Sequence, residues 1–214
     1  MLEARGLSAG YGRAQVLFGL DLAVDQGEVV ALLGRNGAGK STTLKALMGL
    51  VEARSGEVRF GGERIDRQAP HEIARLGLGY VPEDRRIFTD LTVAENLEVG
   101  RQPPRPDAPT WSMEKLIALF PTLGALLQRR GGSMSGGEQQ MLCIARTLAG
   151  NPKAILLDEP SEGLAPVIVD QVAAAILEMK WAGVAVFLAE QSARFTERVA
   201  DRGYKLEKGK ISPA

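Results

Sequence analysis

The stretch Gly34–Thr42 constrains the fold of this chain more than any other part of the sequence. It reads GRNGAGKST and matches the pattern G-x-x-x-x-G-K-[ST] in full. The apolar run Val29–Leu33 precedes it and predicts a buried strand. Apolar residues spaced like one face of a helix follow it, namely Leu44, Leu47, Met48 and Val51. A strand, a glycine-rich loop and a helix in this order predict an α/β fold with a phosphate-binding loop.

Each residue type in this loop has a chemical reason to contact phosphate. Glycines let backbone N–H groups approach phosphate oxygens closely, and the helix N-terminus adds partial positive charge. Lys40 is expected to reach the β- and γ-phosphates, and the Ser41 hydroxyl is expected to ligate Mg²⁺. The predicted nucleotide-binding residues are Gly34, Arg35, Asn36, Gly37, Ala38, Gly39, Lys40, Ser41 and Thr42.

Length and composition limit the classes of protein to which this chain can belong. A chain of 214 residues suits one compact domain. Its 26 basic and 26 acidic residues give a formal net charge of zero, so we expect no nucleic-acid partner. The single cysteine, Cys143, fits a core thiol in a reducing compartment. No signal peptide and no apolar stretch of membrane-spanning length is visible, so we expect a cytoplasmic protein that serves a membrane only through a partner.

Two adjacent carboxylates end a second apolar strand. Asp158 and Glu159 follow the run Ala154–Leu157, where unpaired carboxylates are costly unless something binds them. Asp158 is placed to hold Mg²⁺ at the nucleotide site. Glu159 points elsewhere and is the candidate base that takes a proton from the water attacking the γ-phosphate.

A second phosphate-shaped site follows much later in the chain. Ser135, Gly136 and Gly137 precede an apolar helical pattern, as in a helix N-terminus that binds an anion. An ordinary serine N-cap is the alternative, but it does not explain two glycines where helix propensity should rise. One nucleotide needs one such loop. Either the chain binds two phosphates separately, or two copies share each nucleotide.

Residues 86–148 are expected to form a helical insertion without a strand of its own. Thr92–Glu95 is a capping box that begins a helix. Four prolines within 102–109 exclude a helix there. Further helices are expected over Met113–Phe120 and Leu123–Gln128.

Tyr11 and Glu83 are also candidate ligand-binding residues, and each has an alternative structural interpretation. Tyr11, between Gly10 and Gly12, is either an aromatic platform for a nucleobase or a turn tyrosine, and composition favours the turn. Glu83 follows the predicted strand Gly77–Val81, where α/β folds place ligand groups, and an acidic loop is an equal alternative.

Three motifs in this order resemble the ATP-binding cassette ATPases. They are the phosphate-binding loop, Met134–Gln139, which is similar to the family's signature, and Ile155–Pro160. The resemblance covers nearly the whole chain. It implies an α/β fold with a RecA-like P-loop core, an N-terminal antiparallel β subdomain and an inserted α-helical subdomain. The implied single domain spans 1–214, with core and β subdomain in 1–85 and 149–214.

The resemblance also implies how the two phosphate sites work together. In the family, a head-to-tail dimer holds ATP between the P-loop of one subunit and the signature of the other. Ser135, Gly136, Gly137 and Glu138 would then contact nucleotide across the dimer. Tyr11 matches the adenine-stacking aromatic of the family, which reverses the preference drawn from composition.

Some stretches resemble one subgroup, the shorter ATPase subunit of branched-chain amino acid importers. They are Val81–Phe88, Gly131–Gln140 and Glu162–Pro166. The chain departs from the general cassette pattern at three positions. Glu83 replaces a glutamine that contacts Mg²⁺, Ala165 replaces an aspartate, and Gln191 replaces the histidine that contacts the γ-phosphate. An amide can hold a phosphate oxygen, but it cannot carry a proton as imidazole does.

These observations predict an importer ATPase that uses ATP and Mg²⁺. ATP binding would close the dimer, hydrolysis assisted by Glu159, Lys40 and Gln191 would reopen it, and 86–148 would pass the movement to integral membrane permease subunits. Ser41, Glu83 and Asp158 would hold the metal. The expected partner ATPase is a second copy or a sister subunit, with a periplasmic binding protein as an indirect partner. The expected location is the cytoplasmic face of the plasma membrane.

Other functions remain as alternatives. An importer of urea or short amides would share this ATPase. A soluble cassette ATPase acting on DNA, ribosomes or cofactor assembly is disfavoured, because the chain has no long coiled-coil insert and no basic run. A GTPase is disfavoured because no asparagine is followed by the lysine of an Asn-Lys-x-Asp element.

Overall fold

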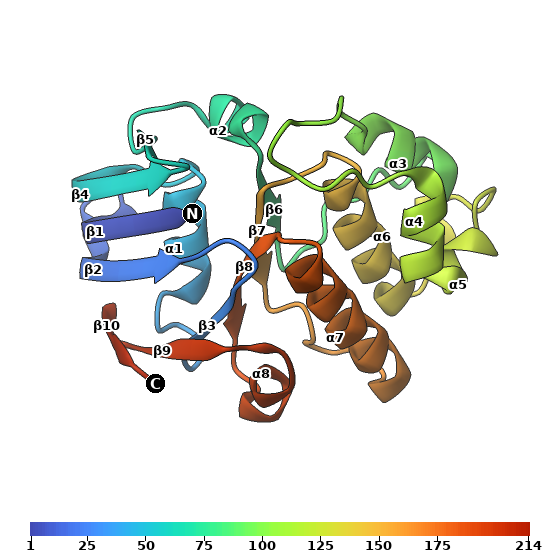
Figure 1. Ribbon diagram of the computed structural model, residues 1–214. Helices are drawn as coiled ribbons and strands as arrows, with labels where there is room; N and C mark the ends of the chain where they lie inside the picture. The colour runs from blue at the N-terminus through green and yellow to red at the C-terminus, as the bar shows by residue number, and fades with distance from the viewer.

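Two β-sheets of different character organise the computed structural model, which describes residues 1–214 (Figure 1). The first sheet is antiparallel, in the order β2-β1-β4-β5. It is built from β1 (Leu2–Tyr11), β2 (Ala14–Val24), β4 (Ala53–Phe60) and β5 (Glu63–Arg64). The predicted β structure before the P-loop and the hairpin around Gly61 and Gly62 are both present, so the N-terminal antiparallel subdomain is confirmed.

The second sheet is mainly parallel, in the order β10-β9-β3-β8-β7-β6. Only the terminal hairpin of β9 and β10 is antiparallel. The strands are β3 (Val29–Leu33), β6 (Leu78–Val81), β7 (Ala154–Asp158), β8 (Ala185–Glu190), β9 (Arg202–Glu207) and β10 (Lys210–Pro213). Parallel strands carry their ligand groups at the carboxyl edge, so β3 and β7 bring the P-loop and Asp158 to the same edge.

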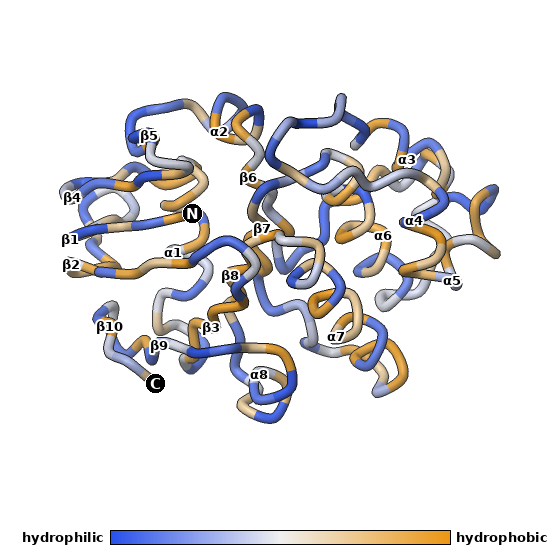
Figure 2. The backbone as a smooth tube through the Cα atoms, viewed as in Figure 1, coloured by the Kyte–Doolittle hydropathy of each residue, from blue (hydrophilic) through white to orange (hydrophobic).

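Alternating side chains of this sheet divide the interior into two hydrophobic cores. Val29 and Ala31 face one core, whereas Val30 and Leu32 face the other. β7 and β8 alternate in the same way, as the period of two in a strand requires. Figure 2 shows apolar residues concentrated on β7 and β8 near the centre of the molecule. The buried strands therefore fix the relative position of every element that carries a site residue.

The helices lie on both sides of this sheet (Figure 1). α1 contributes to the core shared with the antiparallel sheet, and α6 and α7 contribute to the other core. The helices are α1 (Lys40–Leu47), α2 (Pro70–Leu76), α3 (Val93–Gly100), α4 (Met113–Leu119), α5 (Pro121–Gly124), α6 (Gly136–Leu148), α7 (Pro166–Trp181) and α8 (Ala193–Val199). No helix is long and apolar enough to cross a bilayer.

The chain between β6 and β7 forms the predicted helical insertion, with one correction. Its residues 86–148 contain α3 to α6 and no named strand. The expected helix over Leu123–Gln128 is wrong, because α5 begins at Pro121 and ends at Gly124. Proline at the first helical position favours this earlier start, and the glycine lowers helix propensity at the end.

A second correction concerns the end of α1. The apolar stripe predicted a helix that reaches Val51, but α1 ends at Leu47 with Met48 as C-cap. Gly49 follows with φ 72°, a left-handed conformation that ends helices and that glycine adopts most readily. Val51 is still buried, so its apolar character comes from packing beyond the helix.

Candidate functional site

The first turn of α1 has backbone N–H groups without an acceptor in the preceding loop. Thr43 N–H donates to the Gly39 carbonyl at 2.9 Å, whereas the amides of Lys40, Ser41 and Thr42 donate to no loop carbonyl. Such amides, together with the positive end of the helix, favour an anion at this position. The predicted phosphate-binding loop therefore has the donors that a phosphate group requires.

Two glycines of the loop are required by its geometry. Gly39 has φ 112°, which other residues rarely adopt. A Cβ on Gly34 would lie 2.8 Å from the Leu206 carbonyl oxygen, so no side chain fits there. Arg35, Asn36 and Gly37 are exposed at the tip of the loop, and the flanking residues Gly34, Ala38 and Gly39 are half-buried.

Lys40 and Glu159 form a buried ion pair at the base of the loop. Lys40 Nζ lies 2.9 Å from Glu159 Oε1, and the two side chains are only 4% and 7% exposed. Lys40 also donates to the Gly34 carbonyl at 2.8 Å. Glu159 has φ 47°, a left-handed conformation that a non-glycine residue rarely adopts and that commonly marks functional sites. A bound phosphate would compete with this carboxylate for the same ammonium group.

Asp158 lies beside this pair and accepts two hydroxyl hydrogen bonds. Ser41 Oγ donates to its Oδ1 at 3.0 Å, and the Tyr80 hydroxyl donates to its Oδ2 at 3.1 Å. Burial raises the pKa of Asp158 above its ordinary value, although both hydroxyl groups act against this shift. Burial and the neighbouring Asp158 also raise the pKa of Tyr80, so its hydroxyl stays a proton donor. A divalent cation would stabilise the ionised carboxylate that burial disfavours.

The donor set at this position fits Mg²⁺ bound together with a nucleotide. No group of three or more histidine, cysteine, aspartate or glutamate side chains is arranged to hold a metal alone. Mg²⁺ commonly uses one or two carboxylates and takes its other oxygens from substrate phosphates and water. Asp158 and Ser41 supply one carboxylate and one hydroxyl within 3.0 Å of each other.

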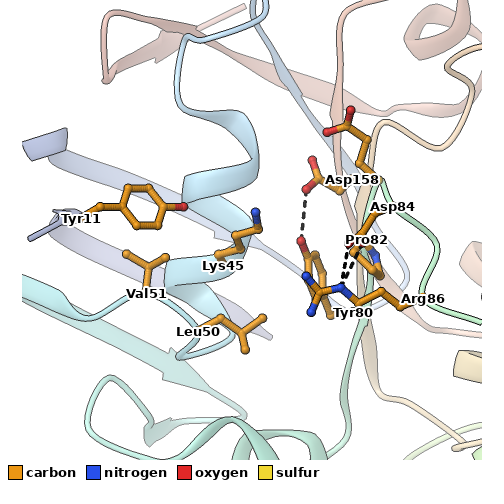
Figure 3. Close-up of a pocket in the computed structure, with 10 residues that line it drawn as sticks. Tyr11, Lys45, Leu50, Val51, Tyr80, Pro82, Asp84, Arg86 and Asp158 are labelled. Atoms are coloured by element: carbon orange, nitrogen blue, oxygen red, sulfur yellow. Dashed lines mark hydrogen bonds and ion pairs between the residues drawn. The ribbon is translucent and has the colours of Figure 1, made fainter. Parts of the chain in front are cut away.

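A cavity of about 500 Å³ lies between Asp158 and the first sheet (Figure 3). Tyr11 and Lys45 lie on one side of it, and Asp158 and Tyr80 lie on the other. Glu83 also lines the cavity and is exposed. Tyr11 is 50% exposed, so its ring is available for a planar ligand. The structure thus brings Tyr11, Glu83 and Asp158 to one cavity, although they lie far apart in the sequence.

Glu159 lines a second cavity, of about 580 Å³. It is lined by Glu162, Glu190 and Gln191 among others. The Glu190 carboxylate accepts hydrogen bonds from Ser161 Oγ at 2.6 Å and from the backbone N–H of Gln191 at 3.0 Å. Gln191 is exposed and lines this cavity.

Ser135 is the N-cap of α6, and its hydrogen bonds lie within its own helix. Glu138 N–H donates to Ser135 Oγ at 3.3 Å, and Ser135 N–H donates to Glu138 Oε2 at 2.7 Å, which makes a capping box. Ser135 and Gly136 are exposed, and Gly137 and Glu138 are half-buried. Figure 1 shows α6 and α1 on opposite sides of β6, β7 and β8. Within one chain, the structure does not bring Ser135–Glu138 to the P-loop.

Sequence reasoning missed three residues of the site. Tyr80 supports Asp158 from the neighbouring strand, Glu190 accepts hydrogen bonds from the backbone after β8, and Glu162 donates its backbone N–H to the Glu159 carbonyl at 3.2 Å. Tyr80 and Asp158 become neighbours only because β6 pairs with β7. No pattern within either strand predicts that the two strands are neighbours.

Comparisons with known proteins agree with this geometry. The family model described as ABC transporter matches residues 17–162. The high-affinity branched-chain amino acid transport ATP-binding protein BraG of Pseudomonas aeruginosa is 46% identical, over 99% of this chain and 91% of its own length. The probable branched-chain amino acid transport ATP-binding protein LivF of Archaeoglobus fulgidus is 32% identical, over 99% and 90%. The lipopolysaccharide export system ATP-binding protein LptB of Haemophilus influenzae is 37% identical, over 99% and 88%.

Solved structures share the whole fold. An ATP-binding subunit of an ABC transporter aligns with a TM-score of 0.86 and 30% identity, covering 100% of this chain and 89% of its own. A nucleotide-free ATP-binding cassette aligns with a TM-score of 0.85 and 26% identity, covering 100% and 90%. The predicted RecA-like core with its β subdomain and helical insertion is therefore confirmed.

Proposed function

The chain belongs to the ATP-binding cassette family of transporter ATPases, and from this premise we propose that it powers an importer of branched-chain amino acids. Members of this family are ATPases whose hydrolysis is coupled to transport. The observation that carries the proposal is the buried Lys40–Glu159 pair beside the Ser41–Asp158 pair, at the start of a helix with unpaired amides. The 46% identity to BraG supports the substrate class.

In this proposal the residues of the loop bind ATP, and Glu159 acts on water. The amides of Gly34–Thr42 and the Lys40 ammonium bind the β- and γ-phosphates. When the phosphates of ATP bind the Lys40 ammonium, the Glu159 carboxylate loses its ion pair. It then accepts a proton from the attacking water. The side-chain N–H of Gln191 donates a hydrogen bond to a γ-phosphate oxygen.

Asp158, Ser41 and Glu83 would hold Mg²⁺ at the same edge of the sheet. When bound, Mg²⁺ neutralises the charge that develops on the phosphate oxygens. Tyr80 keeps Asp158 oriented through its hydroxyl hydrogen bond. This arrangement leaves one face of the cavity to Tyr11, on which the adenine ring would stack.

We further propose that two cassettes assemble head to tail, so that Ser135–Glu138 of one reaches the nucleotide of the other. The exposure of Ser135 and Gly136 supports this role, because an interface residue must be accessible in the single chain. The unit 86–148 would move against 1–85 and 149–214 and drive integral membrane permease subunits. The ATPase would then lie on the cytoplasmic face of the plasma membrane and serve a periplasmic binding protein indirectly.

Replacing Ser135 by alanine tests the shared site. Ser135→Ala should lower ATP turnover by about tenfold or more, since one hydrogen bond to a charged phosphate is lost. It should also cost about 1 kcal/mol of unfolding free energy, because the N-cap is lost. Thr92→Ala removes the matching capping box of α3 and should cost similar stability with full turnover. Equal turnover in both variants would contradict the shared site.

An uptake assay tests the transported substrate. A strain that lacks this chain should lose uptake of labelled leucine, isoleucine and valine, and the wild-type chain should restore it. Uptake of urea and short amides, and export of lipopolysaccharide, should not change. Loss of urea uptake instead would identify the alternative importer, and a defect in lipopolysaccharide export would favour the function named for the LptB relatives.

A further inference from the structure

The Arg54 side chain holds the hairpin turn that follows Tyr11. A two-residue turn, Gly12 and Arg13, joins β1 to β2, and Tyr11 pairs with Ala14 directly before it. Arg54 is the second residue of β4. Its Nη2 donates to the Gly12 carbonyl at 2.7 Å and to the Ala14 carbonyl at 3.0 Å. One guanidinium nitrogen therefore bridges two carbonyl groups of the turn.

This bridge supports the hairpin where its pairing with β4 has ended. The ladder between β1 and β4 ends at Ala9, whose partner is Ala53, two residues before Tyr11. Beyond this point β4 supports the hairpin through the Arg54 side chain. Hydrogen bonds from a charged guanidinium group are stronger than those between neutral groups. Arg54 is thus suited to hold an exposed turn, where water competes for the same carbonyls.

Arg54 can affect the nucleotide cavity without lining it. Tyr11 lines the cavity of about 500 Å³, and Arg54 does not. Leu50 and Val51, in the segment between α1 and β4, line the same side as Tyr11 (Figure 3). The chain therefore runs from the helix of the P-loop, along the cavity, to the arginine that holds the turn. A role for Arg54 would act through the position of Tyr11 rather than through contact with a ligand.

We propose that Arg54 is a positioning residue for adenine binding, which fixes the hairpin turn so that the Tyr11 ring is ready to stack on the base. The inference rests on the proposed function, since it takes Tyr11 as the adenine platform. Tyr11 is 50% exposed, so packing restrains its ring only in part, and the backbone of the turn has to set its direction. Fixing that backbone before the nucleotide arrives lowers the ordering cost of binding.

Equilibrium titration of the full chain with ADP and with pyrophosphate tests this role. Pyrophosphate carries the two phosphates without the nucleoside, so its affinity reports on the P-loop alone. Tyr11→Ala should weaken ADP binding by about fivefold to hundredfold, the range of aromatic stacking on a base. Arg54→Ala should weaken it by about threefold to tenfold, the equivalent of one net hydrogen bond. Both variants should bind pyrophosphate as the wild type does.

Two further arginine variants control for charge. Arg54→Lys keeps a cationic donor without the planar guanidinium group, so it should recover part of the lost ADP affinity. Arg59→Ala is the matched control on the same strand, because its guanidinium pairs with Glu57 at 3.2 Å and not with the turn. It should bind both ligands as the wild type does. Pyrophosphate binding also serves as the folding control, since an unfolded chain binds neither ligand.

The outcomes separate this inference from the proposed function. The double variant Tyr11→Ala with Arg54→Ala should bind ADP no more weakly than Tyr11→Ala, because both changes act through one ring. Multiplied losses in the double variant would overturn the inference, as would wild-type ADP affinity, or an equal loss for pyrophosphate, in Arg54→Ala. Stacking on Tyr11 would stand in each of these cases. Wild-type ADP affinity in Tyr11→Ala would instead overturn the stacking itself, and the inference with it.

Discussion

Glu159→Gln should reduce ATP turnover by roughly 10²–10⁴ while ATP remains bound, because an amide cannot take a proton from water. Binding itself should become tighter. In the wild type, phosphate must displace the Glu159 carboxylate from Lys40, and glutamine has no charge to hold that ammonium. Single-turnover hydrolysis and equilibrium nucleotide binding, measured on the same preparation, separate the two effects.

The control for this prediction is a glutamate outside the site. Glu178→Gln removes an exposed carboxylate of α7 and should leave both turnover and binding unchanged. Near-normal turnover in Glu159→Gln would refute the role of Glu159 as the base. Lost binding in the same variant would show that the Lys40–Glu159 pair shapes the loop rather than competing with phosphate.

Lys40→Met should have the second large effect, on both affinity and stability. Loss of the ammonium should weaken ATP binding by about tenfold to hundredfold, since its hydrogen bonds to charged phosphates disappear. It also leaves the buried Glu159 without its cation. Breaking a buried pair in this way costs about 3–5 kcal/mol of unfolding free energy. Denaturant unfolding and nucleotide titration measure the two losses independently.

The double variant Lys40→Met with Glu159→Gln distinguishes the causes. Because it removes both charges, it should recover most of the lost unfolding free energy. It should not recover ATP affinity, since the phosphates still lack their cation. A double variant as unstable as Lys40→Met alone would contradict the explanation by an unpaired buried charge.

Local patterns predicted the parts of this molecule that depend on neighbouring residues in the sequence. The P-loop required only a short motif between an apolar strand and a helix. The capping box at Thr92–Glu95 and the buried strand before Asp158 were equally local, and all of them are present. The proline-rich stretch 102–109 forms no helix or strand, as the fixed proline backbone requires.

Features that depend on strand order or close packing could not be predicted in this way. Tyr80 reaches Asp158 only because β6 lies beside β7 in the sheet. Only glycine fits at position 124, since a Cβ there would lie 2.6 Å from Ile117 Cγ2. The Lys40–Glu159 pair joins the first residue of α1 to the residue after β7. Each motif identified its own candidate residues, but only the three-dimensional fold shows which residues of different motifs contact each other.

The left-handed backbone at Glu159 has a consequence for how this protein can be improved. A residue with a Cβ is strained in that conformation by about 1–3 kcal/mol, whereas glycine is not. Glycine would relieve this strain, but it would also leave the buried Lys40 ammonium without its carboxylate, and breaking such a pair costs about 3–5 kcal/mol, more than the relief. A search for a hardier variant should therefore keep glutamate at this position and seek stability elsewhere in the chain.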